Sequence, residues 1–223
     1  MKAAVVVYPG SNREHDVAKA LERASGHTPK LIWHGEASLD DKYDLIVLPG
    51  GFSYGDYLRC GAMAAHSPIT RDIIHQANNG TPVLGICNGF QILTETGLLP
   101  GALMRNASLK FASRYVKIRV EATNTMFTSR YKAGQELSVP VAHGDGNYFA
   151  DDKTLDELES EGRVAFRYVR NENPNGASRD IAGILNAKRN VLGLMPHPEN
   201  ATDPLLGSTD GKGLFDSLVS AIS

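Results

Sequence analysis

The fold is decided by the stretch Val83-Leu84-Gly85-Ile86-Cys87-Asn88-Gly89-Phe90-Gln91. Its apolar beginning predicts a buried strand over Pro82–Cys87, and the residues that follow predict a helix over Asn88–Thr96. The two glycines lack Cβ atoms, so strand and helix can approach closely across the tight turn between them. A buried strand that runs directly into a helix is typical of a parallel sheet, whose chemistry lies at the carboxyl ends of its strands.

The same alternation of strand and helix fills the rest of the first half. The pattern predicts strands over Ala3–Tyr8, Lys30–Trp33 and Asp44–Leu48, and helices over Glu14–Ala24 and Ile69–Asn78. The second half is less periodic, with strands expected over Tyr115–Ala122, Glu136–Ala142, Val164–Tyr168, Ile181–Leu185 and Val191–Met195 and a helix over Gly211–Ile222. We therefore expect an α/β fold with a doubly wound, mostly parallel open sheet and a small β extension. Residues 1–223 form one expected domain.

Composition narrows the class of partner. Of 223 residues, 42% are hydrophobic and 22% charged, and the net charge is −2. With no basic excess, we expect neither a nucleic acid nor a membrane as partner. The run Ala3–Tyr8 is too short for a signal peptide, and two cysteines are too few for a disulfide framework, so a reduced, cytoplasmic setting is expected.

The segment around Cys87 has the form Gly-x-Cys-x-Gly between strand and helix, the thiol counterpart of the Gly-x-Ser-x-Gly nucleophile turn. A strained backbone there would present the sulfur clear of the sheet, and the helix N-terminus would favour the reactive thiolate. A buried structural cysteine is the alternative. Cys60 lacks this context and is expected to be structural.

A thiolate mechanism needs an acid/base group and a residue that orients it. His197 follows the apolar segment Val191–Met195, and Glu199 lies two residues further, on the same face of an extended chain. We predict His197 as acid/base and Glu199 as its orienting carboxylate. The backbone N–H groups of Gly51 and Asn88 are candidates for an oxyanion hole, although Pro49-Gly50-Gly51 could also be a plain turn. No metal site is predicted.

Taken together, Pro49-Gly50-Gly51, the Cys87 segment and His197-Pro198-Glu199 resemble the class I, or triad-type, glutamine amidotransferase family, and the resemblance spans essentially the whole chain. It implies a flavodoxin-like fold and a glutaminase reaction, in which L-glutamine is hydrolysed through a thioester on Cys87 to glutamate and ammonia. The narrower resemblance is to members that serve a purine-biosynthetic synthetase. It is carried by Phe52–Arg59, Gly101-Ala102-Leu103, Asn106, Lys110-Phe111, Val141–Gly144, Asn173–Gly176 and Gly193–Pro196.

The narrower resemblance also implies partners. These are a large synthetase subunit, which uses ATP, Mg²⁺ and formylglycinamide ribonucleotide, and a small third subunit. No cofactor is expected on this chain, which has no Gly-x-x-x-x-Gly-Lys-Ser/Thr phosphate loop. Ammonia would pass to the synthetase through a tunnel. The segment Asn106–Tyr115, with Lys110, Phe111 and Arg114, is expected to be exposed and is a candidate docking surface.

Further residues are candidates for contact with glutamine. Gln91 lies one helical turn past Cys87 and can face the same pocket. Phe52 is expected beside the oxyanion turn. Asp56 and Arg59 could bind the α-amino and α-carboxylate groups of the substrate, or could simply pair with each other. His143 could line the pocket or be a satisfied structural histidine.

The sequence departs from the family pattern at two positions and leaves other functions open. Asp145 stands where a glutamate is expected, and Asn200 where a basic residue is common, which affects the expected partner surface more than the chemistry. The alternatives are a cysteine hydrolase or peptidase with the same nucleophile turn, an inactive regulatory subunit, and a glutaminase that serves another synthetase. The segment His197-Pro198-Glu199 argues against the first. An intact set of Cys87, His197 and Glu199 argues against the second, and Phe52–Arg59 against the third.

Overall fold

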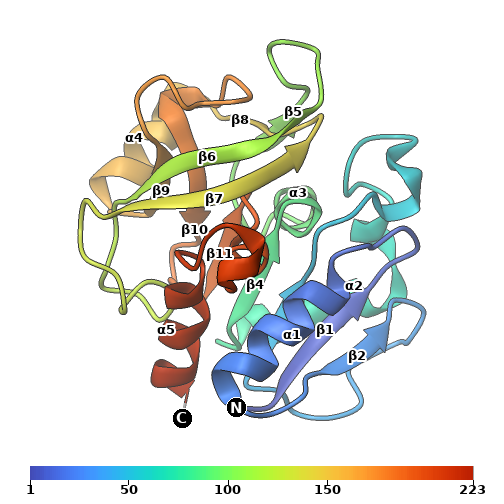
Figure 1. The fold of residues 1–223 in the computed structure, drawn as a ribbon. Coiled ribbons are helices and arrows are strands. Elements are labelled where there is room, and N and C mark those ends of the chain that lie inside the picture. The colour runs from blue at the N-terminus through green and yellow to red at the C-terminus, as the bar shows by residue number, and fades with distance from the viewer. Residues whose placement is uncertain (223) are drawn as a thin grey trace.

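The structure is a computed structural model that describes residues 1–222. The strands are β1 (Ala3–Val7), β2 (Lys30–Trp33), β3 (Leu45–Leu48), β4 (Val83–Ile86), β5 (Ala102–Met104), β6 (Ala112–Val120), β7 (Glu136–His143), β8 (Asn147–Phe149), β9 (Val164–Tyr168), β10 (Ile181–Leu185) and β11 (Val191–Leu194). Nine of them form one sheet in the order β2-β1-β3-β4-β11-β10-β9-β6-β7, and β5 pairs with β8 in a separate ribbon (Figure 1).

The main sheet has two halves. Strands β2, β1, β3, β4 and β11 pair in parallel, whereas β11, β10, β9, β6 and β7 are joined by antiparallel pairings. The predicted doubly wound α/β class is confirmed. The β extension is larger than the small one expected, because four strands continue the main sheet instead of forming a minor appendage.

The helices are α1 (Glu14–Ser25), α2 (Pro68–Asn78), α3 (Asn88–Glu95), α4 (Asp152–Ser160) and α5 (Lys212–Ile222). Helices α1 and α5 pack on each other across one face of the sheet (Figure 1). The crossovers from β1 to β2 and from β3 to β4 move in opposite directions along the sheet. Right-handed crossovers therefore place α1 and α2 on opposite faces. Helix α3 packs on β3, β4 and β11, so it begins at the middle of the sheet.

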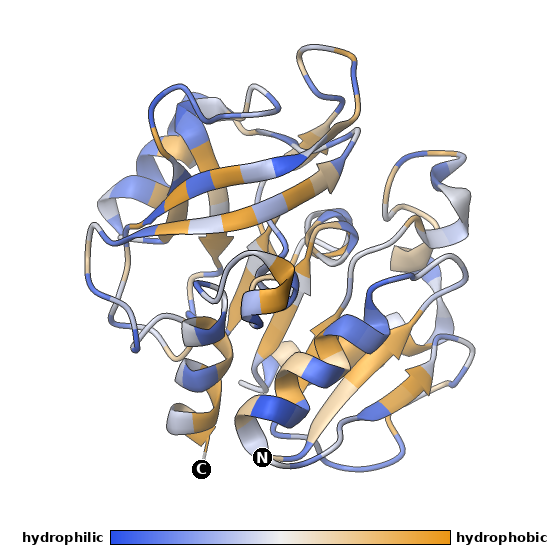
Figure 2. Cartoon of the chain, in the orientation of Figure 1, coloured by the Kyte–Doolittle hydropathy of each residue, from blue (hydrophilic) through white to orange (hydrophobic). Residues whose placement is uncertain are grey.

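The central strands are buried throughout and form the core. Strands β3, β4 and β11 have no exposed residue, while α1 buries Val17, Ala20 and Leu21 and turns its charged face outward (Figure 2). Strand β2, at one edge, leaves Lys30, Leu31 and Trp33 exposed. Apolar burial at about 25 cal/mol per Å² is the main source of stability for such a fold.

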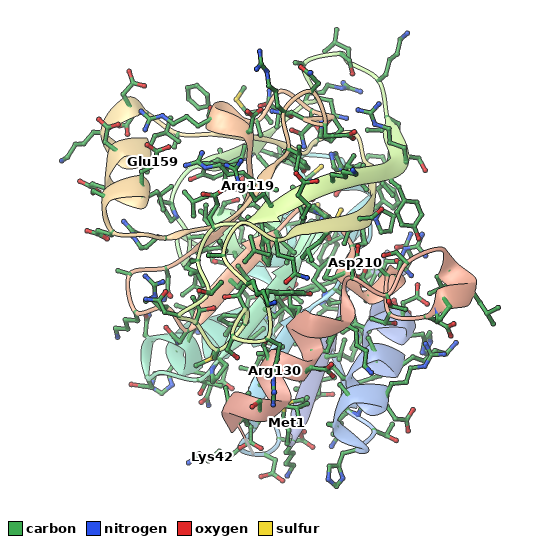
Figure 3. All side chains as sticks on the ribbon, turned by 60° about the vertical axis from the view of Figure 1, so that its left-hand side comes forward. Met1, Lys42, Arg119, Arg130, Glu159 and Asp210 are labelled. Atoms are coloured by element: carbon green, nitrogen blue, oxygen red, sulfur yellow. The ribbon has the colours of Figure 1, made fainter. Side chains whose placement is uncertain are left out.

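Charged side chains gather on the outside of the antiparallel half. Glu159 of α4 lies on this side of the molecule (Figure 3). Arg167 and Arg179 both pair with it, at 2.7 and 2.9 Å. Exposed ion pairs of this kind each contribute about 0–1 kcal/mol to the free energy of unfolding, so they do not determine the fold. No helix within residues 1–222 is long and apolar enough to cross a bilayer.

Candidate active site

Cys87 occupies the turn between β4 and α3. Its backbone has φ 51° and ψ −105°, a region that L-residues rarely adopt, and its side chain is 5% exposed. The Cys87 N–H donates to the carbonyl of Leu194 in β11 at 2.8 Å. The Gly-x-Cys-x-Gly sequence therefore forms a strained turn at the carboxyl end of a central strand, as such a nucleophile turn requires.

Two glycines make this turn possible. A Cβ atom on Gly89 would lie 2.0 Å from the carbonyl oxygen of Leu48, and one on Gly85 would lie 2.7 Å from the backbone of Gly89. Helix α3 therefore sits directly against β3 and β4, with its N-terminus behind the sulfur. The partial positive charge of that helix end favours the thiolate form of the nucleophile.

His197 and Glu199 follow β11, the strand beside β4. The imidazole Nδ1 lies 2.7 Å from Glu199 Oε1, and both side chains are buried. The His197 N–H donates to the carbonyl of Pro140 in β7, which anchors this segment to the antiparallel half. A Cβ atom on Gly50 would lie 2.8 Å from the imidazole, so the bare backbone of Gly50 gives the ring its place.

The charge state of His197 follows from its neighbours. Burial lowers the pKa of His197, but the Glu199 carboxylate and the Cys87 thiolate raise it by more, so that the pKa stands at about 10. Since Nδ1–H donates to Glu199, Nε2 is the nitrogen available for proton transfer. The thiol is close enough to act on the imidazole electrostatically. The hydrogen bond of the Cys87 thiol goes to the Ala142 carbonyl oxygen, 3.9 Å from Sγ, and at this distance it is weak.

The turn after β3 brings the second predicted oxyanion donor to the same edge of the sheet. A Cβ atom on Gly51 would meet the carbonyl oxygen of Gly10 at 2.6 Å, so this position requires glycine. Phe52 N–H is already occupied by Gly10, at 2.9 Å. Within residues 1–222, the N–H groups of Gly51 and Asn88 have no hydrogen-bond partner outside regular secondary structure. Both therefore suit an oxyanion.

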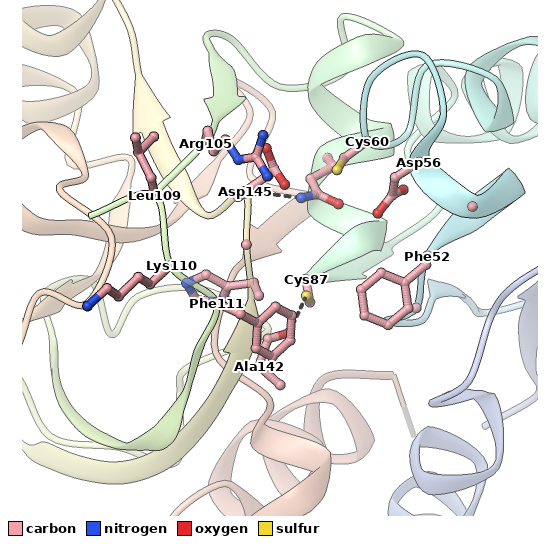
Figure 4. A pocket seen from close by; sticks show the side chains of 15 residues that line it. Phe52, Asp56, Cys60, Cys87, Arg105, Leu109, Lys110, Phe111, Ala142 and Asp145 are labelled. Carbon is pink, nitrogen blue, oxygen red and sulfur yellow. Dashed lines mark hydrogen bonds between the residues drawn. The ribbon is translucent and has the colours of Figure 1, made fainter. Parts of the chain in front are cut away.

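A cavity of about 270 Å³ opens beside the sulfur (Figure 4). It is lined by Gly51, Phe52, Gly55, Asp56, Cys60, Cys87, Gln91, Arg105, Leu109, Lys110, Phe111, Ala142, His143, Gly144 and Asp145. Cys87 lies between the aromatic rings of Phe52 and Phe111, and the charged groups of Asp56, Arg105 and Asp145 lie at the other end. This division suits a ligand with an uncharged reacting end and a charged head.

Gln91 lines the cavity but is engaged on both sides. Its Oε1 accepts from Asn88 Nδ2 at 2.9 Å, and its Nε2 donates to the Asp145 carbonyl at 2.7 Å. Asn88 Oδ1 in turn accepts from Ser53 N–H at 3.2 Å. These bonds link the oxyanion turn, the nucleophile helix and the loop after β7. Gln91 therefore positions the site in addition to lining it.

Asp56 and Cys60 lie together in the cavity wall. Burial raises the pKa of the Asp56 carboxyl, with Asp145 adding to the effect. Burial, then the charges of Asp56 and Asp145, raise the pKa of the Cys60 thiol, so this thiol stays protonated and poorly nucleophilic. The expectation that Cys60 is only structural left out its place in the pocket.

Arg59 was predicted to contact the substrate, but the structure places its side chain outside the cavity that contains Cys87. Its guanidinium makes a two-pronged contact with Glu95 of α3, at 2.6 and 2.5 Å, and does not line the cavity that contains Cys87. It does not pair with Asp56 either, so the proposed i, i+3 ion pair is wrong. The backbone at Tyr54, Gly55 and Asp56 is left-handed, so this segment is not the regular helix in which residues i and i+3 would meet.

His143 is buried at the end of β7, and its Nε2 lies 3.0 Å from Asn175 Nδ2. Burial and the charge of His197 lower the pKa of His143 to about 3, so it is neutral. Asn106 is also fully buried, where the sequence predicted an exposed segment, because it binds the carbonyls of His143 and Lys110. No periodic pattern marks Asn175 or Asn106. In the sequence, these two residues were marked only because Asn106 and the segment Asn173–Gly176 contribute to the narrower family resemblance.

Within residues 1–222, no three His, Cys, Asp or Glu side chains are grouped to hold a metal ion.

The fold and the site define an α/β enzyme domain with a cysteine nucleophile and a buried histidine–glutamate pair. The chain belongs to the CobB/CobQ-like glutamine amidotransferase family, whose domain it matches over residues 1–212. It is similar to phosphoribosylformylglycinamidine synthase subunit PurQ of Novosphingobium aromaticivorans, with 57% identity over 97% of this chain and 96% of that protein. The same subunit of Rhizobium etli is 56% identical, with all of both chains covered.

A solved structure gives the same result. The structure of PurLQS from Thermotoga maritima contains a chain with a TM-score of 0.90 and 46% identity, covering 100% of this chain and 99% of that one. The resemblance stated from sequence motifs is thus confirmed along the whole chain.

Proposed function

We propose that this chain is the glutaminase subunit of a phosphoribosylformylglycinamidine synthase. It hydrolyses glutamine and passes ammonia to the synthetase subunit, which converts formylglycinamide ribonucleotide to formylglycinamidine ribonucleotide in purine biosynthesis. The observation that carries the proposal is the buried His197–Glu199 pair, 2.7 Å apart, beside a strained Cys87. Full-length relatives of this name, 56 and 57% identical, support the choice of synthetase.

The reaction begins at the sulfur. The Cys87 thiolate attacks the carboxamide carbon of glutamine, and the negative oxygen that forms accepts hydrogen bonds from the N–H groups of Gly51 and Asn88. His197, protonated and held by Glu199, donates its Nε2 proton to the departing nitrogen. Ammonia leaves, and the γ-glutamyl group remains on Cys87 as a thioester.

Water completes the cycle. Neutral His197 takes a proton from a water molecule at Nε2, and the resulting hydroxide attacks the thioester carbon. The carbon–sulfur bond breaks, which releases glutamate and restores the Cys87 thiolate beside the imidazolium. Glu199 stabilises the imidazolium in both halves of the reaction.

The partners follow from the same proposal. A large synthetase subunit supplies the ATP and Mg²⁺ sites, a small third subunit completes the complex in the cytoplasm, and this chain binds no cofactor. Residues 1–223 act as one glutaminase domain. The docking surface includes the rim of the cavity, where Leu109 and Phe111 are 74 and 54% exposed beside Lys110. Exposed apolar side chains grouped at a site mouth are typical of a protein interface.

Substitution of Cys87 tests the function. Cys87→Ala should abolish glutamine-dependent synthesis by the assembled complex and leave synthesis from added ammonia unchanged, because only the glutaminase step needs the sulfur. Cys60→Ala is the matched control and should keep both activities. A glutamine-like diazoketone should label the wild-type complex once, at Cys87. Adducts on Cys60, or glutamine use by Cys87→Ala, would contradict the proposal.

A further inference from the structure

We propose that the Nδ1–H group of His143 donates a hydrogen bond to an oxygen atom of the bound glutamine. The inference rests on the proposed function and assigns a substrate-contacting role to one atom. The orientations of the polar groups around the imidazole fix where its proton lies.

The orientation of the Asn175 amide is fixed by the backbone. Ala177 N–H donates to Asn175 Oδ1 at 3.0 Å, and a backbone N–H can only donate. The amide nitrogen of Asn175 therefore faces the other way. It lies 3.0 Å from His143 Nε2 and 3.2 Å from the hydroxyl oxygen of Tyr168, which gives each of its two hydrogens an acceptor.

The tautomer of His143 follows directly. Since the Asn175 amide nitrogen only donates, His143 Nε2 must accept and carries no proton. A neutral imidazole with a bare Nε2 has its hydrogen on Nδ1. If His143 Nε2 carried a proton, its N–H would point at the N–H of the Asn175 amide, and neither group could accept a hydrogen bond. The low pKa of about 3 for His143, caused by burial and by the charge of His197, agrees with this assignment.

The Nδ1–H group has no partner among residues 1–222, although His143 is 98% buried, with 2% of its surface exposed. A Cβ atom on Gly146 would lie 2.2 and 2.3 Å from Cδ2 and Nε2 of the ring, so that edge faces Gly146 and Asn175. The Nδ1 edge faces away from them. His143 also lines the cavity beside Cys87. A buried donor left unpaired is costly, which indicates an acceptor that arrives with a ligand.

The surroundings hold the ring in place before the ligand arrives. Asn106 Nδ2 donates to the His143 carbonyl at 2.9 Å, and Asn106 Oδ1 accepts from Gly146 N–H at 3.0 Å. Ala107 N–H donates to the Asn175 carbonyl at 2.9 Å, which ties the two loops together. These bonds fix the backbone of His143 and the loop that carries Asn175, so the contact between Asn175 and the imidazole is in place before the substrate binds.

Glutamine supplies suitable acceptors. Its carboxamide and carboxylate oxygens accept hydrogen bonds, and it is the molecule that must enter this cavity to reach Cys87. His143 lines the same cavity as Cys87, so a glutamine molecule that enters it to reach the sulfur also meets His143.

The first experiment observes the proton itself. Imidazole ¹⁵N NMR of the Cys87→Ala protein in its complex, which binds glutamine without turnover, should show His143 protonated on Nδ1 and bare on Nε2 between about pH 5 and 8. Addition of glutamine should shift the Nδ1–H resonance. An Nε2-protonated ring, or an Nδ1–H signal that glutamine leaves unmoved, would overturn the inference.

The second experiment uses paired substitutions in the complete complex. His143→Gln retains an acceptor near the Nε2 position and lacks the Nδ1 donor, so kcat/KM for glutamine should fall on the order of tenfold. His143→Asn places an amide N–H near the Nδ1 position and should stay within about threefold of the wild type. Ammonia-dependent synthesis should be unchanged in both. The ratio kcat/KM reports the steps up to thioester formation, so a role with the later water would lower kcat alone.

The outcomes separate the inference from the function on which it rests. A wild-type complex that does not use glutamine would refute the proposed function. A wild-type complex that does, together with a His143→Gln variant of equal kcat/KM, would refute only the role of His143. Equal losses in His143→Gln and His143→Asn would also refute it, because the loss would then not depend on the donor.

Discussion

Two buried histidines in the site have pKa values shifted in opposite directions by their surroundings. His197 faces the carboxylate of Glu199, which accepts a hydrogen bond, and its pKa stands at about 10. His143 faces the amide of Asn175, which donates one, and its pKa is lowered to about 3 by burial and by His197. The site therefore holds one imidazole that carries a proton and one that stays neutral, so acid/base chemistry is confined to His197.

This difference predicts a pH dependence of stability for His143. The unfolded chain binds a proton at His143 below its ordinary pKa of 6.5, whereas the folded protein does not until about pH 3. The unfolded state thus holds more protons in this window, and the free energy of unfolding falls as pH drops from 6.5 to 3, by up to about 1.4 kcal/mol per pH unit.

Chemical denaturation of the wild type and His143→Gln measures this effect. Glutamine is neutral at every pH, so the variant lacks this contribution. The wild type should lose its stability advantage over the variant between about pH 7 and pH 4. An advantage that stays constant over that range would show that His143 is not held neutral.

At the scale of elements, the site joins two loops to helix α3 through side-chain amides. Asn88 and Gln91 of α3 connect Ser53 in the oxyanion turn to Asp145 after β7 through three successive hydrogen bonds. Helix α3 thereby fixes the spacing between the oxyanion donors and the far wall of the cavity. A displacement of about 1 Å at such a junction costs about 100-fold in rate.

Gln91→Glu tests the junction. The carboxylate cannot donate to the Asp145 carbonyl, and it adds negative charge beside Asp56 and Asp145, so glutamine-dependent activity should fall about 100-fold. Ammonia-dependent activity should persist. Gln135→Glu, the same change at an exposed position, is the matched control. Normal glutamine use by Gln91→Glu would mean that the hydrogen-bond chain is dispensable.

The elements were largely predictable because the pattern that forms them is local. Apolar runs such as Leu45–Leu48 and the glycines around Cys87 mark strands and turns within a few residues. Helix α4 was not predicted, since only Leu155 and Leu158 are buried in it and the rest is polar or charged. Strands β5 and β8 are three residues each, too short for a periodic signal.

The candidate site was predictable where its partners are close in sequence. His197 and Glu199 are two residues apart, so an extended backbone places them together. The contacts of Arg59 with Glu95 and of His143 with Asn175 span 36 and 32 residues. Such pairings depend on how loops meet in three dimensions, which a single sequence does not encode locally.

At the scale of the whole molecule, the exposed rim of the cavity lies at one end of the sheet's antiparallel half. Substituting Leu109→Asp together with Phe111→Asp should weaken association with the synthetase without unfolding the chain, because both side chains are largely exposed. Leu31→Asp, on edge strand β2 at the opposite side of the sheet, should leave assembly intact. Sedimentation of the mixed subunits measures both. Equal association of all variants would place the interface elsewhere.

The order of strands has a consequence for how the protein is made. Strand β11 is the last strand among residues 1–222, yet it lies between β4 and β10 in the middle of the sheet, and His197 follows it closely. A nascent chain emerges from the ribosome N-terminus first, so Cys87 is exposed long before β11 can insert beside it. Until the segment that carries His197 has been translated, the thiol has no acid/base partner. An interrupted translation product therefore releases no ammonia, and no glutamine is wasted by incomplete copies.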